Sequence, residues 1–273
     1  MSPPALLRLE GAAAKKKARG VSLAILPGDG WALLGTSRKL ADELYGCLVA
    51  GDVERGSIER PASASSAFRA GRMSSRTTLG SAFKRHEGVA SARALSALGL
   101  WDELGREVGS LDEEEGAAFQ LAYLLSQPGP LHFLGRWADS LSPWRFAGLF
   151  TLLDEVLEAG HAVIAATARA DAAARLGQIV VLKGADPVFA GPVGELLAQA
   201  RPSEVIVETD EPAAVAAMAA PFTMRVTVLP GELHIQAADG QALAARLLTS
   251  GYGHIRSVVV RAPTLDDALL QAT

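Results

Sequence analysis

The sequence predicts an α/β fold with a largely parallel sheet, followed by a separate and smaller α+β domain. Short apolar runs alternate with amphipathic helical segments over the first 200 residues, which is typical of a sheet covered by helices on both faces. Apolar residues make up 49% and charged residues 21% of the chain, enough to build a sizeable core. After Pro202 the rhythm changes to short strands and helices. We therefore expect domains at 1–200 and 204–273.

The first strands are marked by apolar runs and turn residues. Ala5–Glu10 and Val21–Leu26 have strand patterns, and Pro27–Gly30 has the composition of a turn. Trp31–Leu34 is a third apolar run. From Ser37 to Ala50 the spacing of apolar residues predicts a helix.

The middle of the chain is expected to be mainly helical. Residues 61–81 are rich in Ser, Ala, Arg and Gly, which predicts an exposed and mobile connection. Residues 86–127 have a helical pattern throughout, and we assign a helical subdomain to about 77–127. An amphipathic helix is predicted from Ser142. Further strands are predicted at Leu131–Leu134, Ala162–Ala166 and Ile179–Leu182.

The C-terminal part has the order βαββαβ, which is the ferredoxin-like plan. The predicted elements are a strand at Val205–Glu208, a helix at Pro212–Ala219, paired strands at Thr223–Leu229 and Glu232–Gln236, a helix at Gln241–Ser250, a strand at His254–Val260 and a last short helix.

Charge and residue counts exclude several functions. The net charge of -4 and pI near 5.8 argue against nucleic acid as a partner. Cys47 is the single cysteine, so no disulfide framework or zinc cluster is expected, and the five histidines show no pair at metal-ligand spacing. The basic segment Lys15–Arg19 is expected to be a solvated loop rather than a membrane contact. With no apolar run of about 18 residues and no signal peptide, we expect a cytoplasmic protein that reaches the membrane through partners.

The order of landmarks resembles an ABC transporter ATP-binding subunit along nearly the whole chain. Val21–Gly35 resembles the strand that enters the phosphate loop, and Ser110–Leu125 the signature motif with its helix. Pro130–Leu134 through Asp139–Pro143 resembles the Walker B strand with the D-loop, and Gly160–Ala168 the switch strand. Pro263–Leu269 is similar to the C-terminal extension of ATPases that serve ABC-2 type exporters. The resemblance implies an ABC-type nucleotide-binding domain, a RecA-like mixed sheet plus helical subdomain.

The phosphate loop departs from the family. Such a loop needs glycines, a lysine for the β/γ charge and a hydroxyl for magnesium. Here no glycine follows Gly35 before the helix, and the lysine position falls on Ala41 or Asp42. At ~4 Å and an effective dielectric of ~20, an acid against a phosphate charge costs on the order of 4 kcal/mol. The hydroxyl positions fall on Asp42, Glu43 or Leu44, while Arg38 and Lys39 leave open a rebuilt phosphate site.

The other catalytic positions are altered as well. The Walker B acids, one for magnesium and one to position water, correspond to Gly135 and Arg136. The switch histidine corresponds to Ala168 and the D-loop acid to Ser142. The chain has no glutamine before Gln120 to serve the Q-loop.

The signature motif becomes acidic. After Leu111, the small residues expected by the family are replaced by Asp112, Glu113, Glu114 and Glu115. At a helix N-terminus these carboxylates suit the helix dipole. The resemblance implies a further role, because the same charges would oppose closure over ATP bound to a partner subunit.

These losses predict a non-catalytic subunit that binds neither ATP nor magnesium. The resemblance implies that it pairs with an active ABC ATPase homologue and docks on ABC-2 type membrane subunits at the cytoplasmic face. Two alternatives stay open, a free-standing scaffold or regulator with the same fold, and an ATP-binding subunit with a rebuilt site.

Overall fold

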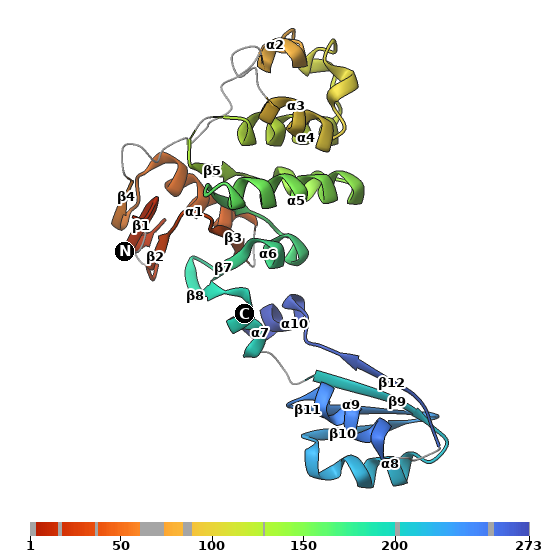
Figure 1. Cartoon of the computed structure of the whole chain (residues 1–273). Coiled ribbons are helices and arrows are strands. Elements are labelled where there is room, and N and C mark those ends of the chain that lie inside the picture. Colours follow the sequence, from red (N-terminus) through yellow and green to blue (C-terminus); the bar gives the residue numbers. More distant parts are fainter. Residues whose placement is uncertain are drawn as a thin grey trace. The chain divides into compact units, whose positions relative to one another are not determined.

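The computed structural model describes residues 4–15, 18–35, 38–60, 74–83, 89–127, 129–199, 203–250 and 254–272. The chain forms two compact units, one up to Gly194 and the other from Glu195 to Ala272. Each unit has its own sheets and core (Figure 1). None of the helices in the described ranges is long and apolar enough to cross a membrane.

A five-stranded mixed sheet forms the centre of the N-terminal unit. Its strands lie in the order β5-β6-β3-β7-β8, of which the first four are parallel and the last is antiparallel. The bounds are β3 (Gly30–Gly35), β5 (Leu131–Leu134), β6 (Ala162–Ala166), β7 (Gly177–Lys183) and β8 (Asp186–Pro192). The four parallel strands were predicted. The edge strand β8 was missed because its side chains alternate between half-buried and exposed, without an apolar run.

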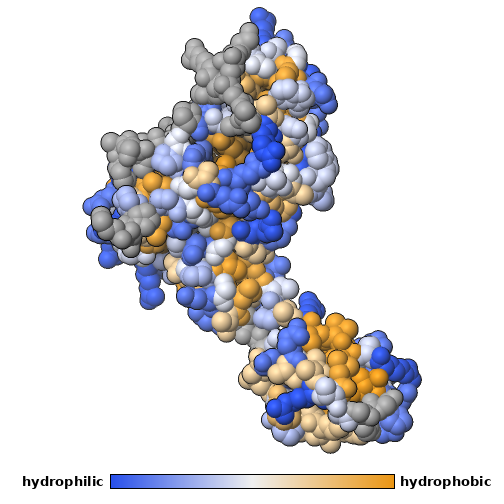
Figure 2. All heavy atoms as spheres, viewed as in Figure 1, coloured by the Kyte–Doolittle hydropathy of each residue, from blue (hydrophilic) through white to orange (hydrophobic). Residues whose placement is uncertain are grey.

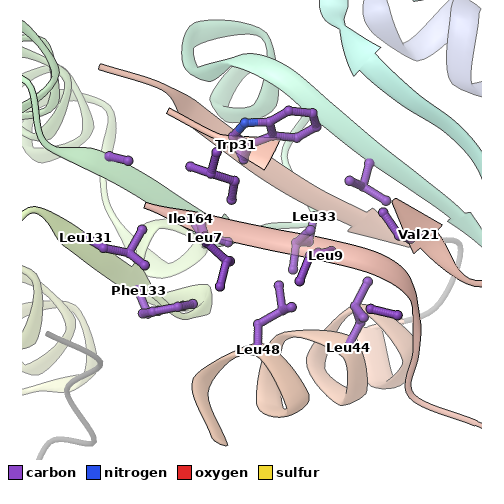
Figure 3. Close-up of a cluster of buried hydrophobic side chains, with 14 of the residues drawn as sticks. Leu7, Leu9, Val21, Trp31, Leu33, Leu44, Leu48, Leu131, Phe133 and Ile164 are labelled. Carbon is purple, nitrogen blue, oxygen red and sulfur yellow. The ribbon is translucent and has the colours of Figure 1, made fainter. Parts of the chain in front are cut away.

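A three-stranded antiparallel sheet packs with the central sheet around one core. Its order is β2-β1-β4, with β1 (Leu7–Ala13), β2 (Val21–Ile25) and β4 (Arg55–Glu59). Figure 3 shows Leu7 and Leu9 of β1 close to Leu33 of β3, with Leu44 and Leu48 of α1 (Arg38–Ala50) beside them. This core places α1 directly after the central strand β3.

Helices cover the remaining face of the central sheet. The contacting helices are α5 (Pro143–Glu158) and α6 (Ala170–Leu176). In β3, Trp31 and Leu33 point into the core shared with β1. Successive side chains of a strand point to opposite faces, so Ala32 and Leu34 point to the other face, and they are buried too. Both faces are therefore covered, as expected for parallel strands.

The helical subdomain is less continuous than predicted. Its elements are α2 (Leu79–Phe83), α3 (Val89–Ala97), the short helices η3 (Trp101–Glu103) and η4 (Val108–Ser110), and α4 (Glu113–Leu125). The prediction of unbroken helix over 86–127 is wrong. Gly99 takes φ +66, and the amide of Leu100 donates to the carbonyl of Leu95, which ends α3. Asp112 then starts α4 as its N-cap.

The predicted connection at 61–81 is described only from residue 74. Within it, Leu79 is fully buried, and two residues past its end Phe83 packs edge-on against Phe119 and Tyr123 of α4. The described end of this segment is therefore part of the subdomain core. Residues 61–73 lie outside the described residues.

The C-terminal unit has the predicted βαββαβ order. After β9 (Ser203–Thr209) come α8 (Pro212–Ala219), η6 (Ala220–Phe222), β10 (Arg225–Leu229), β11 (Glu232–Ala237), α9 (Gly240–Thr249), β12 (Ile255–Arg261) and α10 (Leu265–Ala272). The strands are antiparallel, in the order β10-β11-β9-β12. Helices α8 and α9 share a core with one face of this sheet. Helix α7 (Val193–Ala198) spans the boundary between the units, which falls after Gly194.

Candidate functional site

The segment after β3 carries the residues that correspond to the phosphate loop. β3 ends at Gly35 and α1 begins at Arg38; Thr36 and Ser37 lie outside the described residues, as does the side chain of Lys39. Ala41 is fully buried, whereas the Asp42 side chain is 49% exposed and Glu43 is half-buried. The first turns of α1 therefore present two carboxylates, Asp42 and Glu43, at positions where the sequence resemblance leads one to expect a lysine and a hydroxyl.

Arg136 pairs with Asp42 across this site. The strand β5 ends at Leu134, and Gly135 is the N-cap of a short helix, η5 (Arg136–Ser140). The Arg136 Nε atom lies 2.6 Å from Oδ1 of Asp42. The contact joins two segments that the sequence resemblance treats as separate losses, the phosphate loop with its lysine position at Ala41 or Asp42, and the Walker B end with Arg136. The two side chains neutralise each other's charge, so neither requires a bound phosphate or cation as a counterion.

Asp139 extends this pair to the switch segment. Its Oδ2 accepts from Arg136 at 3.3 Å, and its carboxylate also accepts from the Thr167 hydroxyl and from the Ala168 amide at 3.0 Å. Asp139 is only 13% exposed and Thr167 is buried. The ends of β5 and β6 and the start of α1 are thus joined by one hydrogen-bonded network, named here the Asp42–Arg136–Asp139 network.

The network was not predicted as a unit. Gly135, Arg136 and Ala168 were expected only as positions that had lost a function, and Asp139 was assigned to the D-loop. A signal was present in the sequence, since an acid three residues after Arg136 lies within reach of its side chain in a helical turn. The Ala168 position keeps a role through its backbone amide, which the side-chain comparison overlooked.

A small cavity of about 10 Å³ lies beside α1, lined by Ala12, Val21, Leu44 and Leu182 among others. The Lys15 ammonium lies 3.0 Å from the Glu43 carboxylate. A cavity of this size holds about one water, whereas small-molecule sites occupy roughly 300–1,000 Å³. Lys16 and Lys17 of the basic segment lie outside the described residues.

The acidic replacement of the signature motif caps α4. Asp112 accepts from the Glu115 amide and the Glu115 carboxylate accepts from the Asp112 amide, a complete capping box. Glu115 also binds Arg106 through two bonds of 2.8 and 2.9 Å. This bidentate contact between the Arg106 guanidinium and the Glu115 carboxylate lowers the pKa of Glu115 and raises the pKa of Arg106. Leu111 precedes the cap and is half-buried.

Glu114 reaches the start of α5. Its Oε1 accepts from the Ser142 amide at 2.9 Å and from the Ser142 hydroxyl, and these bonds lower the pKa of Glu114. Ser142 is the N-cap of α5, so the carboxylate takes up an amide at a helix N-terminus. Among the four acids, Asp112 and Glu113 are the exposed ones. The expected repulsion toward a partner's ATP therefore rests mainly on these two.

Two histidines that are far apart in sequence meet in space. His132 of β5 is buried, and its Nε2 lies 3.0 Å from Nδ1 of His161, which precedes β6. The contact arises because β5 and β6 are parallel neighbours, and the spacing of the histidines along the chain showed no sign of it. Burial lowers the pKa of His132 to about 4. No group of three His, Cys, Asp or Glu side chains in the described part of the chain is arranged to hold a metal ion.

Comparisons with known proteins agree with this architecture. No family model matches the sequence, and no curated protein matches it. Among solved structures, an ATP-binding subunit of an ABC transporter superposes with a TM-score of 0.58 at 14% identity, covering 71% of this chain and 92% of that one. CbiO1 of Clostridium perfringens, part of the ABC transporter complex CbiONQ, gives 0.56 at 16% identity, covering 71% and 91%. A bacterial Atm1-family ABC exporter with ATP bound gives 0.58 at 14%, covering 73% and 40%. The chain thus has a fold that resembles ABC transporter ATP-binding cassettes.

Proposed function

We propose that this chain is a non-catalytic ABC-ATPase-like subunit in which an internal ion pair stands where the nucleotide would bind. The observation that carries the proposal is the contact between Arg136 and Asp42. In a working phosphate loop, a lysine neutralises the β/γ-phosphates and a Walker B acid holds magnesium. Here both charges are reversed. Asp42 and Arg136 therefore attract each other, while Asp42 repels phosphate and Arg136 repels magnesium.

The mismatch opposes both ligands of the family. A phosphate approaching α1 would meet Asp42 and Glu43, and a magnesium ion approaching β5 would meet the Arg136 guanidinium. Breaking the Asp42–Arg136–Asp139 network to admit them would also leave Asp139, 13% exposed, without its cationic partner. Uncompensated charges of this kind cost on the order of 3 kcal/mol or more. The site is therefore better suited to holding the fold together than to binding ATP.

A subunit that keeps the cassette fold without its chemistry retains surfaces for assembly. We propose that it pairs with an active ABC ATPase homologue and docks on ABC-2 type membrane subunits, which would bring it to the cytoplasmic face of a membrane. Support comes from the cassette-like N-terminal unit and from the C-terminal sheet, whose βαββαβ order and strand order β10-β11-β9-β12 fit a ferredoxin-like extension. CbiO1, with a similar fold, is itself part of a transporter complex.

Co-purification from membranes tests the assembly. A tagged full-length chain, purified from detergent-solubilised membranes of its own host, is expected to bring down a multispan protein and an ATPase with an intact phosphate loop. In that complex, replacing the partner's phosphate-loop lysine should abolish ATP hydrolysis, whereas Lys39→Ala in this chain should leave turnover unchanged. Recovery without membrane protein would favour a free-standing scaffold or regulator. Loss of turnover with Lys39→Ala would favour a rebuilt ATP site.

A further inference from the structure

The C-terminal sheet has one regular, exposed edge, the strand β10. It pairs on one side with β11 through five consecutive residue pairs without a register shift, from Arg225↔Gln236 to Leu229↔Glu232. In the described part of the chain, no strand pairs with its other side. The two strands are joined at Pro230-Gly231, where Gly231 takes φ +82. A straight edge of this kind presents a row of backbone donors and acceptors that another strand can use.

The opposite edge of the same sheet is built differently. The pairing of β12 with β9 shifts register between Ile255 and Ser257, which marks a bulge. Arg256, within this bulge, pairs with Asp210. Bulges and charged side chains are devices by which native proteins protect a sheet edge. The three central residues of β10, Val226, Thr227 and Val228, carry neither.

Apolar side chains flank β10. The C-terminal unit shows apolar surface in Figure 2, and on this edge Met224 is 70%, Val228 57% and Leu229 43% exposed. Val226 and Val228 project to the face that carries α8 and α9, since Val226 packs against that core and Val228 is two residues further along the strand. Leu229 and Arg225 project to the opposite face. Both faces of the edge therefore offer apolar surface to a neighbouring strand.

We propose that β10 pairs antiparallel with β10 of a second copy of this chain, about a two-fold axis at Thr227. This register places Arg225 opposite the partner's Leu229, and Val226 opposite the partner's Val228. The charges favour a second copy as the occupant of this edge. Arg225 of one copy lies opposite Leu229 of the other, and within that other copy Leu229 is paired with Glu232. The basic end of one strand therefore lies near the acidic end of the other hairpin. The two four-stranded sheets join into one of eight strands. This self-association is separate from the proposed pairing with an ATPase.

A symmetric β pairing has a register that cysteine cross-linking can read. At the two-fold axis residue 227 faces itself, and directly opposite Cβ atoms lie about 4.5–5.5 Å apart. In the same register the Arg225 residues of the two copies are offset by four residues. Their Cα atoms are therefore roughly 13 Å apart along the strands, beyond the ~7 Å limit for a disulfide. Thr227 is exposed, so its replacement leaves the core intact.

The test uses the full-length chain in a Cys47→Ser background. Sedimentation equilibrium is expected to show a concentration-dependent dimer, with disulfide-linked dimer from Thr227→Cys and little or none from Arg225→Cys. Val228→Lys should weaken dimerisation at least about tenfold, since it places an ammonium within the pairing. Val259→Lys is the matched control, because Val259 is 54% exposed on the other edge, and it should not weaken dimerisation. A monomer at all concentrations, equal linkage at both cysteines, or equal effects of the two lysines would overturn the proposal.

Discussion

Removing the Arg136 charge provides a quantitative test of the Asp42–Arg136–Asp139 network. Arg136→Met keeps most of the aliphatic stem and deletes the guanidinium. The Arg136 side chain is 18% exposed and Asp139 is 13% exposed, whereas Asp42 is 49% exposed. Exposed ion pairs are worth about 0.2–1 kcal/mol, while contacting partners in one network couple by roughly 0.5–3 kcal/mol. We therefore expect coupling energies of about 2 kcal/mol between Arg136 and Asp139 and about 0.5–1 kcal/mol between Arg136 and Asp42.

Double-mutant cycles measure these two couplings. The variants Arg136→Met, Asp139→Asn and Asp42→Asn, singly and in pairs, would be unfolded in urea and followed by tryptophan fluorescence. All four tryptophans lie in the N-terminal unit, so the signal reports that unit and is not mixed with unfolding of the other. High salt should reduce the coupling with Asp42 more than that with Asp139. Couplings near zero, or a stronger coupling to Asp42 than to Asp139, would refute the reasoning.

Three further predictions follow from the same region. Arg136→Glu alone should give no ATP hydrolysis above the parent in a phosphate-release assay, because no lysine or magnesium ligand returns with it and catalytic groups act as a unit; clear turnover would contradict this. Glu114→Ala should destabilise the N-terminal unit by about 1–2 kcal/mol in urea unfolding through loss of the Ser142 bonds, while the exposed Glu113→Ala should stay within about 0.5 kcal/mol; equal effects would argue against the contact. Because the folded-state pKa of His132 is lowered from 6.5 to about 4, its neutral form stabilises the unit above pH 6.5, and roughly 3 kcal/mol is lost as pH falls toward 4. His132→Asn should remove this slope from the pH dependence of unfolding, and an unchanged slope would show that other groups cause it.

Periodic apolar segments were predictable from the sequence. The runs Leu131–Leu134 and Ala162–Ala166 became strands with the predicted bounds, and the helix after Ser142 begins at Pro143 as its cap and proline indicate. Each of these segments buries a continuous face, so local pattern and tertiary environment agree. The βαββαβ order of the C-terminal unit was predictable for the same reason.

Sequence reasoning missed one strand that depends on a distant partner and one turn that interrupts a helical pattern. Strand β8 is an edge with alternating exposure, and its pairing with β7 decides its conformation. The break in the helical subdomain rests on Gly99, whose positive φ is a local choice that the surrounding apolar periodicity concealed. For β8 the tertiary pairing outweighs a weak local signal, whereas the turn at Gly99 is set locally.

The sequence offers the candidate site only as single positions, and the network that joins them was not predicted. Reading single positions predicts that Ala41 or Asp42 and Arg136 replace family residues, because each lacks the chemistry of the residue expected there. Their contact spans 94 residues and depends on α1 following β3 while η5 follows β5. The bond between Glu114 and Ser142 likewise joins two segments that the sequence comparison treated as separate losses. Pairings of this kind arise from the fold and are visible only once the strands are placed.

Titration of the purified full-length chain with ATP at millimolar magnesium tests the central claim most directly. Isothermal calorimetry would follow binding, with intrinsic tryptophan fluorescence as a second readout, since all four tryptophans lie in the N-terminal unit. We expect no saturable signal, because the Asp42–Arg136–Asp139 network presents reversed charges to both phosphate and magnesium. A saturable signal with a dissociation constant below about 100 μM, a binding free energy stronger than about 5.5 kcal/mol, would contradict this expectation.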